Sequence, residues 1–163
     1  MKNAVLSRRK RAQNGHCIAE FGPALFLGIV GFFMPSFALI FLGVDYFSCY
    51  ELNDLETSEA CKVSQTAAES KTSPLVTVMK RWESSGLGRF VNPVEDPVTK
   101  VNYVESPDFG DKSRDIYVTV TTTVKCRPFI NVPLLKDIAG VGAPMTLTLA
   151  NQSFCEYPSI AKK

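Results

Sequence analysis

The chain of 163 residues has a single histidine, His16, close to its N-terminus. After that position, no serine or cysteine nucleophile can be activated by a histidine. The five cysteines include no C-x-x-C pair, which argues against a thioredoxin-like redox motif and against common zinc sites. We therefore predict a protein that is not an enzyme and that binds no metal and no cofactor.

Charged residues are absent from Phe21 to Val44. This apolar run can cross a bilayer, since about 20 helical residues cover a hydrocarbon core of roughly 30 Å. The leader before it, residues 1–15, is basic and holds no acid: Lys2, Arg8, Arg9, Lys10 and Arg11. Positive charge beside a membrane segment marks the cytoplasmic side. We predict a cytoplasmic N-terminus, one transmembrane helix over residues 16–45 and an exported domain over residues 46–163.

A cleaved secretory signal is the simplest alternative for this part of the chain. The apolar core of such a signal is about 7 to 15 residues long and ends at small residues before the cut. The run here is longer, and more apolar residues follow the small-x-small sequence at residues 36–38. A secretory signal therefore fits poorly.

The exported part is nearly neutral, with 13 basic and 14 acidic residues after Asp45. It shows no basic footprint for a nucleic acid, so we predict no such partner. Its four cysteines permit two disulfides and indicate an oxidising compartment: Cys49, Cys61, Cys126 and Cys155. Zinc is the competing interpretation, but the spacing and the lack of histidine disfavour it.

Residues 46–71 contain neither proline nor glycine. Apolar residues recur there at near-helical spacing, at Leu52, Leu55, Val63 and Ala67. We predict that the membrane helix continues over residues 46–71 as a stalk. The acids between the apolar positions are expected on a solvated face: Glu51, Asp54, Glu56 and Glu59. Ser73 and Pro74 are typical of a fresh helix start, and Trp82 is expected to anchor that helix in the core.

Residues 115–126 carry the clearest strand pattern. Apolar side chains alternate there with polar ones, and only Thr122 interrupts the apolar face: Ile116, Val118, Val120, Val124 and Cys126. Residues 145–149 alternate in the same way, and residues 99–105 are a third candidate strand. We predict an α+β fold with an antiparallel sheet of about three strands.

This arrangement constrains the disulfides. In a continuous helix, Cys49 and Cys61 lie about 18 Å apart along the axis and cannot bond each other. Antiparallel pairing places Cys126 and Cys155 at opposite ends of their strands. Each strand cysteine is then expected to bond a helix cysteine, in an arrangement that remains open.

A single carboxylate, Glu20, precedes the apolar run, where it can lie at the headgroup level at little cost. A sharper interpretation joins it to Gly15. Cleavage after Gly15 would free an α-amino group on His16, and Glu20 would be the fifth residue of the mature chain. An ammonium and a carboxylate that pair in an apolar setting offset each other's desolvation.

The sequence from Gly15 to Phe21, G-H-C-I-A-E-F, resembles the type IV prepilin cleavage motif in its tight-adherence form. With the basic leader, the apolar helix and the exit residues Gly43 to Tyr46, the chain resembles the TadE family of minor pseudopilins. The resemblance implies a pseudopilin of the bacterial cytoplasmic membrane that supports assembly of a tight-adherence pilus and can enter it. It also implies a prepilin peptidase, the pilus assembly machinery and other pilins as partners. The alternative is an uncleaved single-span anchor that presents a small binding or sensor domain.

Overall fold

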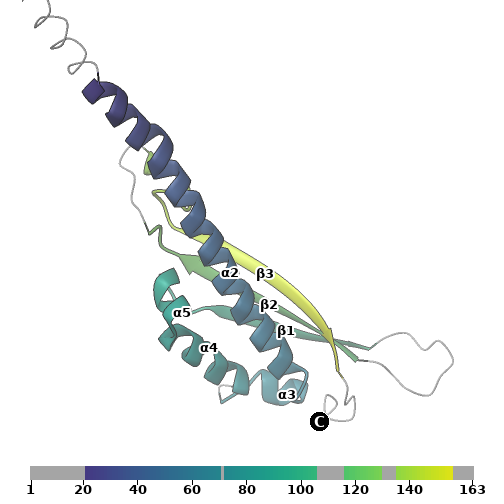
Figure 1. Cartoon of the computed structure of the whole chain (residues 1–163). Coiled ribbons are helices and arrows are strands. Elements are labelled where there is room, and N and C mark those ends of the chain that lie inside the picture. Colours follow the sequence, from purple (N-terminus) through teal and green to yellow (C-terminus); the bar gives the residue numbers. More distant parts are fainter. Residues whose placement is uncertain (1–20, 71, 106–115, 130–134, 156–163) are drawn as a thin grey trace, which may run out of the picture. The chain divides into compact units, whose positions relative to one another are not determined.

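The computed structural model describes residues 21–70, 72–105, 116–129 and 135–155 (Figure 1). Gly15, His16 and Glu20 lie outside these residues, so the predicted cleavage motif enters the description only with Phe21. The chain divides into two compact units, residues 1–40 and residues 41–163. The second unit therefore begins within the apolar run, five residues before the predicted boundary at residue 46.

Helical residues run from Phe21 to Ala60 and include a π-helical turn, η1 (Ile29–Phe33), followed by α2 (Met34–Ala60). In η1 the N–H of Met34 bonds the carbonyl of Ile29, five residues back. The wider turn directly precedes Pro35, which has no N–H to donate to the helix. The Ser36 hydroxyl donates to the Phe32 carbonyl at 2.7 Å and satisfies one carbonyl of the altered turn.

The second unit contains a three-stranded antiparallel sheet in the order β1-β2-β3. Its strands are β1 (Val98–Glu105), β2 (Ile116–Cys126) and β3 (Met145–Phe154). The predicted α+β class and the antiparallel pairing of the last two strands are confirmed. The register places Cys126 opposite Met145 at one end of this pair and Tyr117 opposite Phe154 at the other.

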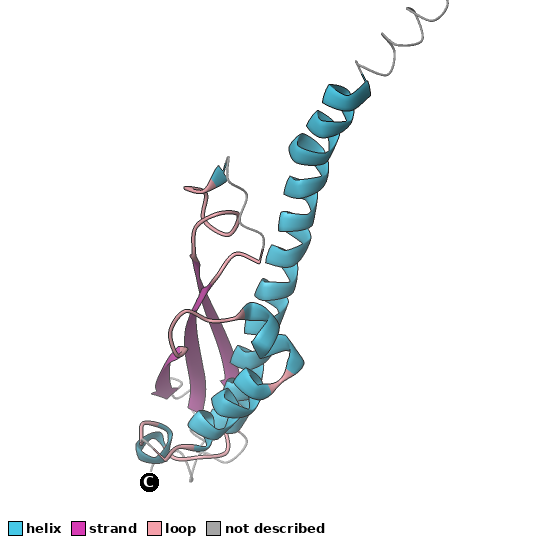
Figure 2. Ribbon diagram, turned by 90° about the vertical axis from the view of Figure 1, so that its left-hand side faces the viewer, coloured by secondary structure: helices cyan, strands magenta, loops and turns pink. Residues whose placement is uncertain are grey.

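In the described residues after α2, three shorter helices follow: α3 (Gln65–Ala68), α4 (Pro74–Ser84) and α5 (Gly86–Val91). The predicted start of α4 is confirmed, because the Ser73 side chain accepts a hydrogen bond from the Leu75 N–H. In Figure 2 the helices of this unit lie on one side of the sheet.

The prediction that one continuous helix extends to Lys71 is wrong, because α2 ends at Ala60. A contact from β1 fixes this end, since the Tyr103 hydroxyl donates to the Ala60 carbonyl at 2.8 Å. Burial raises the pKa of Tyr103 to about 12, which keeps the hydroxyl protonated as a donor. Ser64 then starts the next helix as its N-cap. The helix end thus depends on a strand that lies about 40 residues later in the chain.

Among the described residues, two apolar clusters lie between the helices and the sheet. One gathers around the end of α2, with α3, α4 and the first half of β2: Ala60, Ala68, Leu75, Ile116, Val118, Val120 and Cys155. The other joins the middle of α2 to α4, α5 and the end of β2: Cys49, Leu52, Trp82, Val91, Val124 and Cys126. The predicted apolar face of β2 is therefore the face that packs against helices.

Candidate functional site

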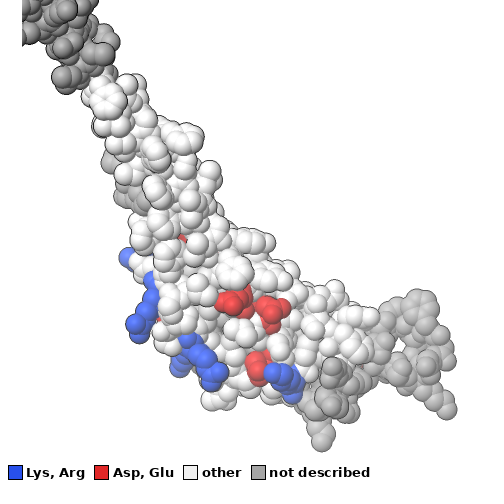
Figure 3. Space-filling model, viewed as in Figure 1, with Lys and Arg blue, Asp and Glu red and all other residues white. Residues whose placement is uncertain are grey.

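The helical residues of the first unit expose apolar side chains. Phe21, the one residue of the predicted cleavage motif that the structure describes, is 65% exposed, and Phe26, Leu27 and Phe32 are exposed to a similar degree. No charged side chain interrupts residues 21–44, which leaves this stretch of the helix white in Figure 3. The segment is long and apolar enough to cross a membrane.

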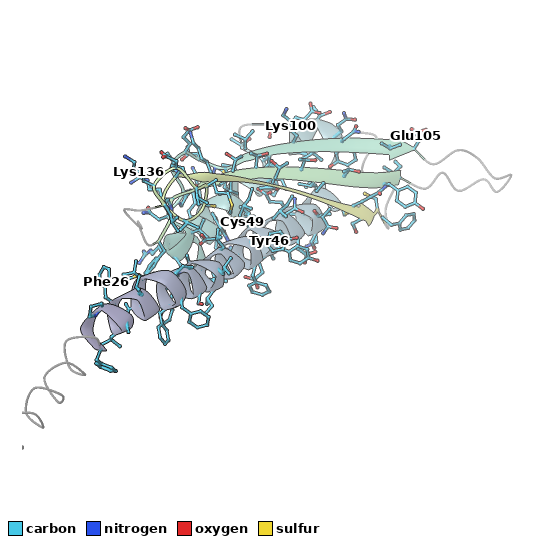
Figure 4. All side chains as sticks on the ribbon, turned by 90° about the horizontal axis from the view of Figure 1, so that it is seen from above. Phe26, Tyr46, Cys49, Lys100, Glu105 and Lys136 are labelled. Atoms are coloured by element: carbon cyan, nitrogen blue, oxygen red, sulfur yellow. The ribbon has the colours of Figure 1, made fainter. Side chains whose placement is uncertain are left out.

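Within the second unit, α2 has two different faces. The exposed face carries aromatic residues near its start and acids farther on: Tyr46, Phe47, Tyr50, Glu51, Asp54, Leu55 and Ser58. The buried face is largely polar: Asp45, Ser48, Cys49, Leu52, Asn53, Glu56, Thr57 and Ala60. Cys49, labelled in Figure 4 beside the strands, lies on this buried face, whereas Tyr46 is half exposed.

The prediction that Glu56 lies on a solvated face is wrong, because its side chain is only 1% exposed. Its two carboxylate oxygens accept hydrogen bonds from Thr99 at 2.8 Å and from Thr122 at 2.5 Å. The Thr122 hydroxyl in turn accepts from the Asn53 side chain at 2.9 Å, and Asn53 also donates to the Val120 carbonyl at 3.1 Å. The polar network of Asn53, Glu56, Thr99 and Thr122 therefore joins α2 to β1 and β2.

Burial raises the pKa of Glu56, and the hydrogen bonds from the two threonines act against this rise. In the described part of the chain, the partners of this carboxylate are hydroxyl groups and not cations. The threonine that interrupts the apolar face of β2 is thus the one that meets the buried acid. Sequence reasoning noted Thr122 but had no signal that pointed to Glu56 as its partner.

The four cysteines of the domain lie in two separate pairs. Cys49 and Cys126 contact each other in the second cluster, where the hydrogen bond between them raises the pKa of Cys49 and lowers the pKa of Cys126. Cys61 contacts Cys155 at the first cluster, and burial raises the pKa of Cys155 to about 12. All four are free thiols in this structure. Among the described residues, no three metal-binding side chains gather at one point.

Trp82 is the predicted core anchor, and its side chain is buried. Its indole N–H donates to the Ser48 carbonyl on α2 at 3.0 Å, so it holds α4 against α2 as well as against the sheet. Gly88 in α5 is required by the same packing, because a Cβ there would lie 2.1 Å from the Trp82 carbonyl oxygen.

In comparisons with protein-family models, with curated proteins and with solved structures, nothing matches this chain.

Proposed function

We propose that this chain is a TadE-like minor pseudopilin that a prepilin peptidase cleaves after Gly15. The observation that carries the proposal is the division of one helix into two chemically different parts. Residues 21–40 expose apolar side chains, whereas residues 41–60 bury a polar face against an antiparallel sheet. A pseudopilin needs both parts, because the same helix must lie in a membrane and carry a folded domain.

The length of the apolar part fits a bilayer. Residues 21–40 rise about 30 Å at 1.5 Å per residue, which matches the hydrocarbon core. We therefore assign the membrane-spanning segment to residues 21–40 and the exported domain to the unit that starts at Phe41. Within that unit, the ring of Phe41 packs at a tilt against the ring of Phe129, with 4.3 Å between the ring centres, which supports this boundary.

Cleavage after Gly15 gives the mature chain a new amino group on His16. In a filament, Glu20 of one subunit then pairs with the amino group of its neighbour, and Phe21 begins the apolar surface that neighbouring helices cover. The basic leader keeps the N-terminus in the cytoplasm until the peptidase removes it. The assembly machinery and other pilins are the partners that act after this step.

The test is the intact mass and N-terminal sequence of the protein recovered from its native cell membrane. The proposal expects an N-terminus at His16. A full leader in cells with an active prepilin peptidase contradicts it and supports the uncleaved anchor that presents a binding or sensor domain.

A Glu20→Ala variant tests the assembly role separately from cleavage. We expect it to insert into the membrane as the unaltered protein does but to lose pilus assembly. Glu51→Ala is the matched control, because Glu51 is an exposed acid on α2, outside the apolar segment. Normal pilus assembly with Glu20→Ala would count against the proposed role of this carboxylate.

A further inference from the structure

We propose that the mature domain contains two disulfides, Cys49–Cys126 and Cys61–Cys155, which link α2 covalently to the two ends of the sheet. The inference of oxidation in the cell rests on the proposed export of the domain, because exported compartments are oxidising. The choice of partners rests on the geometry of the folded domain alone.

The first pair lies in the interior of the domain. Cys49 is fully buried on α2, and Cys126, the last residue of β2, is 2% exposed. Both belong to the buried cluster that surrounds Trp82, so the fold brings the end of β2 to this part of α2. A disulfide here joins two residues that already share one buried cluster.

The second pair lies at the C-terminal end of α2. Cys61 follows the last residue of the helix, and Cys155 follows the last residue of β3. The backbone N–H of Cys155 bonds the Ile116 carbonyl at 2.9 Å, which fixes the cysteine beside the start of β2. Cys61 is half-buried and lines a surface groove of about 500 Å³, so an oxidant can approach this pair in the folded domain.

The other pairings require sulfur atoms to meet over distances that the fold does not allow. Cys49 and Cys61 are separated by about 18 Å along the axis of α2. Cys126 and Cys155 lie at opposite ends of the β2–β3 pair, about 30 Å apart for ten residues of strand. A disulfide needs Cα atoms within about 7 Å. The crossed arrangement, Cys49 with Cys155 and Cys61 with Cys126, would join residues that belong to different clusters.

Each disulfide forms by thiol–disulfide exchange with a disulfide oxidant, either a protein disulfide or glutathione disulfide. A cysteine thiolate attacks the oxidant, gives a mixed disulfide and releases one thiol. The second cysteine loses its proton and attacks the mixed disulfide, which forms the Cys–Cys bond and releases the second thiol. Two electrons and two protons pass from each cysteine pair to the oxidant.

The experiment is disulfide mapping by mass spectrometry on the full chain, after free thiols are blocked. One sample is recovered from the native cell membrane, and a second is folded in detergent and oxidised with a glutathione redox buffer. Digestion must combine two proteases. Cleavage after Glu51 or Glu56 separates Cys49 from Cys61, and cleavage after Lys136 separates Cys126 from Cys155.

We expect peptides that join Cys49 to Cys126 and Cys61 to Cys155 in both samples. Crossed peptides, or free thiols at Cys49, Cys61, Cys126 or Cys155 in a folded and fully oxidised sample, would overturn the pairing; Cys17 lies outside both pairs and serves as the free thiol of the chain. The proposed pairs in the oxidised sample with reduced thiols in the cell sample would leave the pairing intact and contradict export. The two failures are therefore distinguishable.

Two double variants provide an independent readout in the oxidised full chain. Cys49→Ala with Cys126→Ala removes one proposed pair, so we expect one disulfide and no newly free thiol in the domain. Cys49→Ala with Cys155→Ala removes one member of each pair, so we expect Cys61 and Cys126 to react with a thiol reagent. Crossed pairing predicts the reverse pattern, with Cys61–Cys126 intact in the second variant and two free thiols in the first.

Discussion

For the replacement of Thr122 by valine, the sequence pattern and the structure predict opposite changes in stability. By pattern alone, Thr122→Val completes the apolar face of β2 and should stabilise the domain. In the structure, the substitution removes the hydroxyl that donates to the Glu56 carboxylate and accepts from Asn53. We therefore expect Thr122→Val to destabilise the protein.

The size of the effect follows from two opposing terms. A hydrogen bond to a charged group contributes about 1.5–3 kcal/mol, and its loss leaves one buried oxygen of Glu56 without a partner. The added methyl group returns about 0.8 kcal/mol through burial. Asn53 keeps its bond to the Val120 carbonyl, which limits the damage on that side. The net expectation is a loss of about 1–2 kcal/mol in the free energy of unfolding.

The pH dependence adds a second expectation. Because burial raises the pKa of Glu56 in the folded state, the folded protein keeps a proton that the unfolded chain has already lost. The contribution of this group to stability therefore falls as pH rises from the unfolded pKa to the folded pKa. Thr122→Val removes a bond that favours the carboxylate, so its cost should grow over the same pH range. Glu56→Gln should remove this part of the pH dependence.

The assay is urea unfolding of the full chain in detergent micelles at several pH values, at a fixed redox state. Trp82 is the only tryptophan and is buried, so its fluorescence reports the domain. Thr121→Val is the matched control, since the neighbouring threonine points to the opposite face of the sheet. It should change stability by less than about 0.5 kcal/mol. Equal stability of Thr122→Val, Thr121→Val and the unaltered protein would refute the reasoning.

Two further expectations concern α5 and the buried face of α2. Gly88→Ala should lower the midpoint of thermal unfolding strongly, because its Cβ would meet the Trp82 carbonyl. Gly86→Ala is the control, since its Cβ has open space and should leave the midpoint unchanged or raise it. Equal midpoints for the two variants would contradict the predicted clash and mean that the backbone between α4 and α5 adapts freely. Ser48→Ala should be neutral or stabilising by up to about 1 kcal/mol in urea unfolding, because the buried Ser48 hydroxyl has no hydrogen-bond partner among the described residues. A clear loss of stability would reveal a partner for that hydroxyl.

The parts of the fold that could be predicted are those whose signal lies within a short stretch of sequence. The alternation along β2 identifies its buried face, and the Ser73–Pro74 pair marks the start of α4, because each signal is contained in a few adjacent residues. The membrane-length helix is equally local, since the lack of charge from Phe21 to Val44 is visible without any tertiary contact.

The parts that could not be predicted depend on partners far away in the chain. Glu56 reads as a solvated acid until Thr122, 66 positions later, is placed beside it. The end of α2 at Ala60 depends on Tyr103, 43 positions later. The arrangement of the cysteine pairs depends on which end of α2 meets which end of the sheet, and no local pattern encodes that choice.

The helical backbone that passes from residues 40 to 41 also has a mechanical consequence. A pull on the apolar segment, such as extraction from a bilayer, enters the domain at Phe41 and acts first on the part of α2 that follows this residue. When non-covalent contacts are loaded from one end, they break one after another along the helix, so each contact bears the force in turn. With a covalent bond at Cys49, eight residues along the chain, the pull passes directly into β2 and is shared by its two neighbouring strands. The domain would then resist tension as a unit, and its rupture force should fall when a reductant is added.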